Sequence, residues 1–170
     1  MSYEKVKILN CVLSIKVVGR FVLGSDKLKL GGCSMFLSDT YIKNIVEFLV
    51  ENLECNFIYL FGSFAKGEGR EDSDIDIAVH TNKNVTAYDL FMLAGDLSFI
   101  VKRDVQIIDL KDVSTVFAAQ IVGTREVIYS KNENLRIEYE IRAFKDYARL
   151  NEERQPILDS IKKDGRIYGK

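Results

Sequence analysis

One stretch, residues 62–76, constrains the fold and the chemistry of this chain more than any other. It joins an apolar strand predicted at residues 57–61 to a second at residues 75–79, through a small-residue turn and a polar loop. Side chains alternate across a strand, so Asp74 and Asp76 are expected to project from the same face. Two carboxylates held together at the end of a sheet outline a site for a divalent metal ion.

The turn that follows the first strand predicts a phosphate site. Glycine at position 62 lets the backbone bend closely, and Gly62 and Ser63 then present N–H groups where a helix begins. Such amides bind phosphate oxygens. Beside two carboxylates suited to magnesium, the turn indicates a site for a nucleotide and its metal ion. Lys66 and Arg70, in the same loop, are candidates to contact the phosphates, although loop cations are more often simply solvated.

The spacing Gly-Ser, ten residues, Asp-x-Asp resembles the signature of the DNA polymerase β-like nucleotidyltransferases. Residues 35–170 are similar in size to a minimal nucleotidyltransferase domain. The resemblance implies an α/β fold with a small mixed sheet, flanking helices and a long C-terminal helix. It also implies ATP as substrate and Mg²⁺ as cofactor, with Gly62 and Ser63 holding the β- and γ-phosphates and with Asp74 and Asp76 holding the metal.

A plain acidic turn, or a calcium loop, is the competing interpretation of Asp72, Ser73, Asp74 and Asp76, because hard cations accept this set of ligands. An EF-hand loop, however, needs a glycine and a terminal glutamate at offsets where this loop has neither. The two carboxylates also lead directly into an apolar strand rather than a flexible loop.

The composition fits one globular domain without a general affinity for long nucleic acid. The 170 residues are 47% hydrophobic, and 24 basic against 25 acidic residues give a net charge of −1.

The three cysteines, Cys11, Cys33 and Cys55, lack a metal-like spacing. The single histidine, His80, gives zinc chemistry little support and suits a strand-end surface position better than a nucleotide contact. With no signal peptide or membrane span in sight, the expected compartment is the cytoplasm.

Helical and extended patterns alternate along the chain, as an α/β domain requires. Helices are predicted at residues 38–53, 86–101, 113–122 and 132–154, and strands at residues 57–61, 75–79, 104–110 and 126–129. Pro156 is expected to stop or bend the last helix. The tail, residues 157–170, is typical of a docking segment. One apolar face of the last helix comprises Ile137, Ile141, Phe144 and Ala148.

Residues 1–34 form an extension of uncertain status ahead of the predicted domain at 35–170. Two short strands fit its apolar residues, but it carries no recognisable chemistry. One hypothesis is that it lies upstream of the natural start, because Gly31 and Gly32 can be encoded by a ribosome-binding sequence just before Met35. N-terminal mass spectrometry of the native protein would test this.

Two-metal nucleotidyl transfer usually takes a third carboxylate from a neighbouring strand. In a regular strand Asp104 and Gln106 share one face and Asp109 lies on the other, so Asp104 and Asp109 cannot both contribute a carboxylate to the site. Asp104 is the favoured third metal ligand and catalytic residue. The resemblance aligns the third aspartate of the family with Gln106, whose amide oxygen can bind a metal but carries no charge and is no base.

Small members of this family resemble the antitoxin half of toxin–antitoxin pairs, whose partner is a helical HEPN ribonuclease. The resemblance implies transfer of AMP from ATP to a tyrosine of that toxin, which silences it. The expected assembly is a homodimer or a hetero-oligomer with the toxin. Two alternatives are open: modification of a small molecule, as in aminoglycoside nucleotidyltransferases, and a non-catalytic module that masks the toxin by contact, which Gln106 favours.

Overall fold

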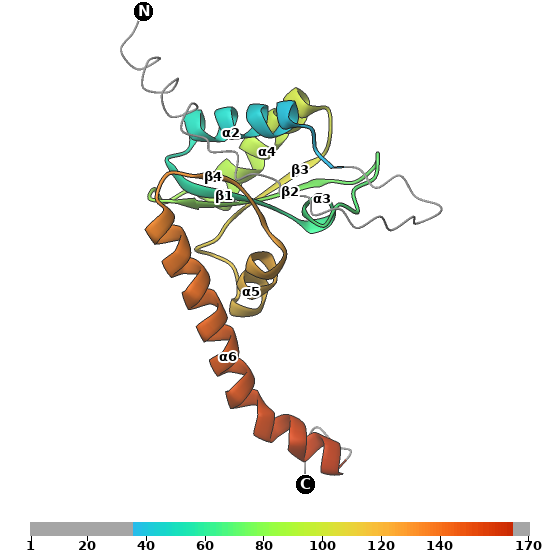
Figure 1. Cartoon of the computed structure of the whole chain (residues 1–170), viewed down its shortest axis with the longest axis vertical. Helices are drawn as coiled ribbons and strands as arrows, with labels where there is room; N and C mark the ends of the chain where they lie inside the picture. The colour runs from blue at the N-terminus through green and yellow to red at the C-terminus, as the bar shows by residue number, and fades with distance from the viewer. Residues whose placement is uncertain (1–35, 165–170) are drawn as a thin grey trace, which may run out of the picture. The chain divides into compact units, whose positions relative to one another are not determined.

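A four-stranded mixed sheet in the order β3-β2-β1-β4 organises the domain (Figure 1). In the computed structural model, which describes residues 36–164, the strands are β1 (Cys55–Phe61), β2 (Ile75–Thr81), β3 (Val105–Asp109) and β4 (Glu126–Ser130). Strand β2 pairs antiparallel with β1 and parallel with β3, while β4 pairs antiparallel with the other edge of β1. The two motif strands are therefore the central pair.

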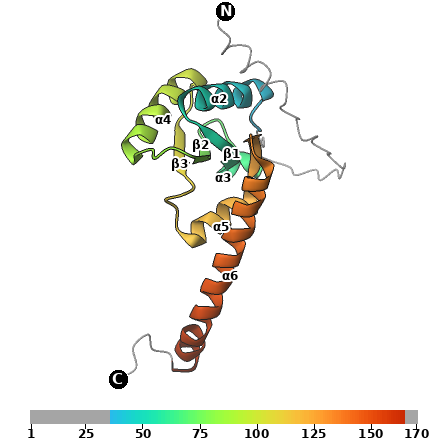
Figure 2. The ribbon, with the colours of Figure 1, turned by 90° about the vertical axis from the view of Figure 1, so that its left-hand side faces the viewer.

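Helices cover both faces of this sheet. They are α2 (Asp39–Asn52), α3 (Gly62–Ala65), α4 (Ala87–Val101), α5 (Thr115–Thr124) and α6 (Glu133–Asp164). Helices α2 and α4 lie on one face, whereas α5 and the start of α6 lie on the other, and Figure 2 shows α6 extending away from the sheet. The mixed sheet, its flanking helices and the long C-terminal helix confirm the predicted fold.

Burial on both faces explains why β1 is a continuous apolar run. All seven of its residues are buried. Ile58 and Leu60 pack towards α2 and α4, and Phe57, Tyr59 and Phe61 pack in the second cluster with residues of α5 and α6. The side chains of β1 thus join two cores, and the site at its end rests on a rigid strand.

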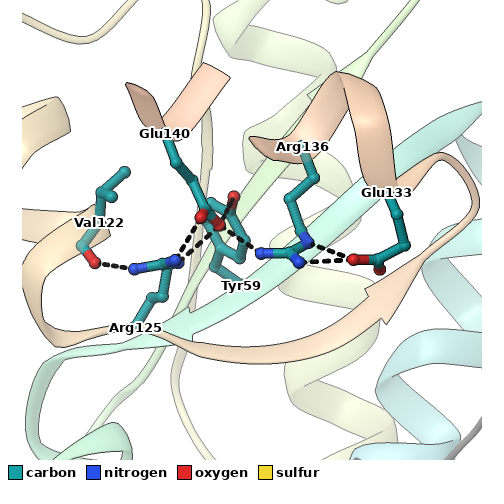
Figure 3. Close-up of polar contacts among 6 residues, drawn as sticks. All are labelled: Tyr59, Val122, Arg125, Glu133, Arg136 and Glu140. Carbon is teal, nitrogen blue, oxygen red and sulfur yellow. Dashed lines mark hydrogen bonds and ion pairs between the residues drawn. The ribbon is translucent and has the colours of Figure 1, made fainter. Parts of the chain in front are cut away.

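The first three turns of α6 are held to the sheet by a network of charged side chains (Figure 3). Tyr59 donates a hydrogen bond to Glu140 over 2.9 Å, and Arg125 and Arg136 donate to the same carboxylate over 2.8 and 2.6 Å. Arg136 also pairs with Glu133, and Arg125 donates to the carbonyl of Val122. Both oxygens of Glu140 therefore have partners, which come from β1, α6 and the residue before β4.

The helix predicted to end near residue 154 continues through Pro156 to Asp164, so Pro156 does not stop it. Proline removes the N–H that would bond to the carbonyl of Glu152. All residues from 151 to 160 are exposed, so water can bond that carbonyl instead. Much of the tail predicted as a docking segment is thus helical.

The predicted apolar face of α6 points to solvent. Ile137, Ile141 and Phe144 are 44%, 49% and 48% exposed, whereas the helix packs on the domain through Leu135, Tyr139 and Ala143. No helix within residues 36–164 is both long and apolar enough to cross a membrane. The predictions for residues 1–34, including the boundary at residue 35, lie outside the described residues.

Candidate functional site

The turn after β1 lies directly against the carboxylate of Asp76, the second residue of β2. Phe61 pairs with Asp76 across the two strands, and Gly62 follows with a φ of 71°. A Cβ atom on Gly62 would lie 2.0 Å from Oδ2 of Asp76. Only glycine fits here, on grounds of both space and backbone conformation. The structure therefore brings the glycine turn and the Asp-x-Asp motif together.

Neither carboxylate of this motif has a bonding partner among the described residues. Asp74 is exposed and Asp76 is half-buried, and within residues 36–164 no hydrogen bond or ion pair reaches either side chain. Burial, and then the charge of Asp74, raise the pKa of Asp76. Both effects oppose a second negative charge at this place. A divalent cation would compensate that charge, so the donor set fits a metal ion.

The side chain opposite Asp76 on β3 is Gln106. The parallel register pairs these two residues, and Gln106 is exposed. Asp104 lies just before β3, is also exposed, and accepts a 2.8 Å hydrogen bond from Ile75 through its main-chain carbonyl. Asp104 as third carboxylate therefore stays a prediction. In the described part of the chain, no cluster of three or more His, Cys, Asp or Glu side chains is arranged to hold a metal ion.

Asp109 is separate from this group. It pairs with Val79, four residues along β3 from the start of the strand, and is 4% exposed. Its carboxylate accepts a hydrogen bond from the Lys111 amide at 3.0 Å and lies 3.4 Å from the Lys111 ammonium. Asp109 is thus a buried, bonded carboxylate far along the strand from Asp76.

The remaining predicted residues lie around the turn. Ser63 is half-buried in α3, and Lys66 follows the end of this helix. Arg70 lies in the outer loop, where its amide donates to the Ser73 hydroxyl over 2.9 Å. The side chains of Lys66 and Arg70 are exposed and make no ion pair with another described residue. Their contact with phosphate stays a prediction.

Comparison with known proteins decides the family. A model of the polymerase beta nucleotidyltransferase family matches residues 43–134, which include the turn, both aspartates and Gln106. The chain belongs to this family. Among its relatives is the protein adenylyltransferase MntA of Shewanella oneidensis, which is 30% identical over 118 residues, 69% of this chain and 84% of MntA.

Several solved structures to which this chain is similar are toxin–antitoxin complexes. One is a toxin–antitoxin structure with AMP-PNP, matched with a TM-score of 0.66 and 30% identity over 71% of this chain and 97% of the other. A second is the MntA–HepT complex, with a TM-score of 0.63 and 27% identity over 73% and 98% of the two chains. A third holds a tri-AMPylated Shewanella oneidensis HEPN toxin with its MNT antitoxin, with a TM-score of 0.63 and 27% identity over 74% and 98%.

One residue beside this candidate site was missed by the sequence analysis. Arg103 contacts the loop between the turn and Asp74, although it follows that loop by some 30 positions in the sequence. A lone arginine ahead of a strand is typical of solvated surface charge, so no local pattern could have identified it. Only the parallel pairing of β2 with β3 brings it to the site.

Proposed function

We propose that this chain is an antitoxin that transfers AMP from ATP to a tyrosine hydroxyl of a HEPN-type toxin, with which it assembles. The observation that carries this proposal is its similarity to the protein adenylyltransferase MntA, of which the chain covers 84%. The toxin–antitoxin structures with AMP-PNP and with a tri-AMPylated toxin support ATP as donor and the toxin as acceptor. The Gly62 turn against Asp76 supplies a matching site.

Magnesium is the proposed ion at Asp74 and Asp76. Mg²⁺ usually binds proteins through one or two carboxylates and takes its other ligands from water and substrate phosphates. Asp74 and Asp76, which have no bonding partner within residues 36–164, suit this preference, because their oxygens can bind the ion while water and phosphates supply the other ligands. When bound, Mg²⁺ would offset the negative charge of the phosphates and of the leaving pyrophosphate.

The protein groups act mainly by positioning. The backbone amides at Gly62 and Ser63 hold the terminal phosphates, and Lys66 and Arg70 offset their charge. The tyrosine oxygen attacks the α-phosphorus in line, the bond from this phosphorus to the bridging oxygen breaks, and pyrophosphate leaves. The tyrosine proton passes to a base, for which Asp104 is the candidate.

Incubation with α-labelled ATP, Mg²⁺ and the co-purifying toxin tests this function. Label is expected on the toxin, and none with Asp74→Asn. Asp72→Asn is the matched control, because it removes an exposed charge from the same loop without touching the motif pair. Absence of label from the wild type despite measurable ATP binding would reject the transfer reaction.

A contact-only antitoxin is the second candidate, and Gln106 opposite Asp76 favours it. The variants Gln106→Asp and Asp104→Asn distinguish a contact-only antitoxin from an AMP-transferring one. If transfer is limited by a missing third carboxylate, the substitution is expected to raise the rate, and Asp104→Asn then to have little effect. If Asp104 supplies the carboxylate, Asp104→Asn abolishes transfer. If the chain only masks the toxin, it neutralises the toxin without ATP and none of these variants changes that.

A further inference from the structure

Arg103 holds the loop that carries the acidic motif. Its Nη1 atom donates hydrogen bonds to the main-chain carbonyls of Arg70, at 3.1 Å, and Glu71, at 2.6 Å. Both carbonyls belong to the loop that runs from α3 to Asp74. Hydrogen bonds from a charged donor are stronger than those between neutral groups, so these bonds hold the loop backbone firmly.

The same guanidinium also contacts the glycine turn. Its central carbon lies 5.5 Å from the centroid of the Phe64 ring, within the range of a cation–π interaction. Phe64 directly follows Ser63 in α3 and is only 1% exposed. A single side chain therefore contacts both halves of the motif, the turn proposed to hold phosphate and the loop that leads to the carboxylates.

The main chain beside Arg103 is tied to the carboxylate strand as well. The carbonyl of Asp104 accepts a 2.8 Å hydrogen bond from the amide of Ile75, the residue between Asp74 and Asp76. The position of Arg103 is thus set relative to the first residues of β2. Its side chain transmits that position to the loop and to the turn.

The loop itself has few other restraints. Residues 70–72 are exposed, and apart from the Arg103 contacts their hydrogen bonds within residues 36–164 are a short turn from Ser73 to Arg70 and the bond from the Arg70 amide to the Ser73 hydroxyl. These two bonds close the outer part of the loop upon itself, whereas the hydrogen bond from the Glu68 amide to the Ser63 carbonyl, at 2.9 Å, fixes only the start of the loop to the turn. Misplacement of a reacting group by about 1 Å can lower a rate by about a hundredfold.

We propose that Arg103 is a positioning residue for nucleotidyl transfer, which sets the distance between the Gly62–Ser63 turn and Asp74 without touching the nucleotide. This inference rests on the proposed function. A lysine cannot replace the arginine, because its single ammonium lacks the planar group that lies over an aromatic ring while it donates to two carbonyls.

Kinetics of Arg103→Lys, which keeps the charge, test the proposal with the full chain and its toxin. We expect kcat to fall about 10- to 100-fold, with KM for ATP within threefold of the wild type and a severalfold higher Mg²⁺ concentration for half-maximal rate. Phe64→Leu, which removes the ring but keeps an apolar side chain, is expected to cause a smaller fall. The control is Lys102→Gln, whose ammonium lies over Phe99 and away from the site.

Two results would overturn the proposal. A kcat of Arg103→Lys within twofold of the wild type would mean that the position of the loop does not depend on the guanidinium. A KM for ATP raised tenfold or more, with kcat unchanged, would mean that Arg103 binds the nucleotide directly.

Hydrogen exchange separates a failure of this proposal from a failure of the proposed function. Amides of residues 68–75 are expected to exchange faster in Arg103→Lys than in the wild type, while those of β1 do not change. Faster exchange would show that Arg103 restrains the loop even if the wild type transferred no AMP, in which case the proposed function alone would have failed. Unchanged exchange would reject it whatever the activity.

Discussion

Asp76 and Glu140 lie over the same face of the sheet, yet their surroundings are opposite. Glu140 receives hydrogen bonds from Tyr59, Arg125 and Arg136 (Figure 3). Asp76, which pairs with Phe61 on the neighbouring strand, receives none from any residue of the described region and has Asp74 as its charged neighbour. A half-buried carboxylate without a partner in the described region opposes folding, which points to a role in binding a ligand rather than in stabilising the domain.

The difference separates structural from functional charge. Both carboxylate oxygens of Glu140 are bonded within the domain, so its charge is compensated by the protein itself. The Asp76 carboxylate accepts no hydrogen bond from a described residue, and the absence of a Cβ atom at Gly62 leaves space for this carboxylate. The folded chain leaves the negative charge of Asp76 uncompensated, which costs free energy. Binding of a cation would recover this free energy, and this is the physical basis of an affinity for a cation at Asp76.

The largest expected effect comes from Asp74→Asn. Removal of this charge is expected to lower AMP transfer about a thousandfold or more, because electrostatic stabilisation of the reacting phosphates depends on it. The melting temperature should stay near that of the wild type, since the side chain is exposed and makes no bond to the domain. Activity equal to the wild type would exclude Asp74 from the site.

Glu140→Gln is expected to have the opposite effect to Asp74→Asn, because it should lower the stability of the domain rather than the rate of AMP transfer. It leaves Arg125 and Arg136 without their shared charge and should destabilise the domain by roughly 3 kcal/mol, because both arginines are mostly buried. Urea unfolding measures this change. The matched control is Glu133→Gln, which breaks an ion pair whose carboxylate side chain is 60% exposed and should cost less than about 1 kcal/mol. Equal effects of the two substitutions would contradict a structural role specific to Glu140.

Two glycine substitutions compare the site with a neutral surface. Gly62→Ala is expected to destabilise the domain by about 1–2 kcal/mol and to displace Asp76, because its φ is positive and the new Cβ collides with the carboxylate. Gly95→Ala in α4 meets nothing within 4 Å, so it should stabilise by about 0.5–1 kcal/mol. Thermal unfolding of both variants checks the signs, and a stable, active Gly62→Ala protein would refute the close approach.

The smallest expected effect is a pH dependence of stability. The raised pKa of Asp76 means that the folded domain binds this proton more tightly than the unfolded chain. Its contribution to stability is therefore present below the ordinary carboxyl pKa and is lost as pH rises through the higher pKa of the folded state. Asp76→Asn should remove this loss, and Mg²⁺ should reduce it in the wild type. Identical pH profiles of wild type and variant would show that Asp76 is not perturbed.

Local patterns account for what the sequence predicted correctly. The helix after Ser38, the strands at both sides of the motif and the helix after Thr86 follow from apolar periodicity. Thr86 also forms a capping box with Asp89, whereas the Ser38 side chain makes no capping hydrogen bond. The turn and the Asp-x-Asp pair are close in the sequence, so their contact follows from one strand–loop–strand unit. The family resemblance aligned Gln106 with the third carboxylate, and the register places it opposite Asp76.

Long-range contacts explain what the sequence could not predict. Tyr59 and Glu140 are 81 residues apart, and the arginines that join them look like ordinary surface charges. Arg103 reaches its loop only after β3 pairs with β2. Pro156 indicated a helix end because its effect on the backbone is local, whereas the exposure that lets the helix continue depends on the fold.

Because α6 is long, the thermal unfolding of its far half should report whether another molecule is bound to the helix. Its 32 residues span about 48 Å, but only the first turns are fastened to the domain, and every residue from 151 to 160 is exposed. Helical segments without tertiary contacts are marginally stable in water, so this far half should fray as temperature rises, well before the sheet unfolds. Circular dichroism would then record a two-stage melt for the isolated chain and a single stage wherever another molecule covers the helix.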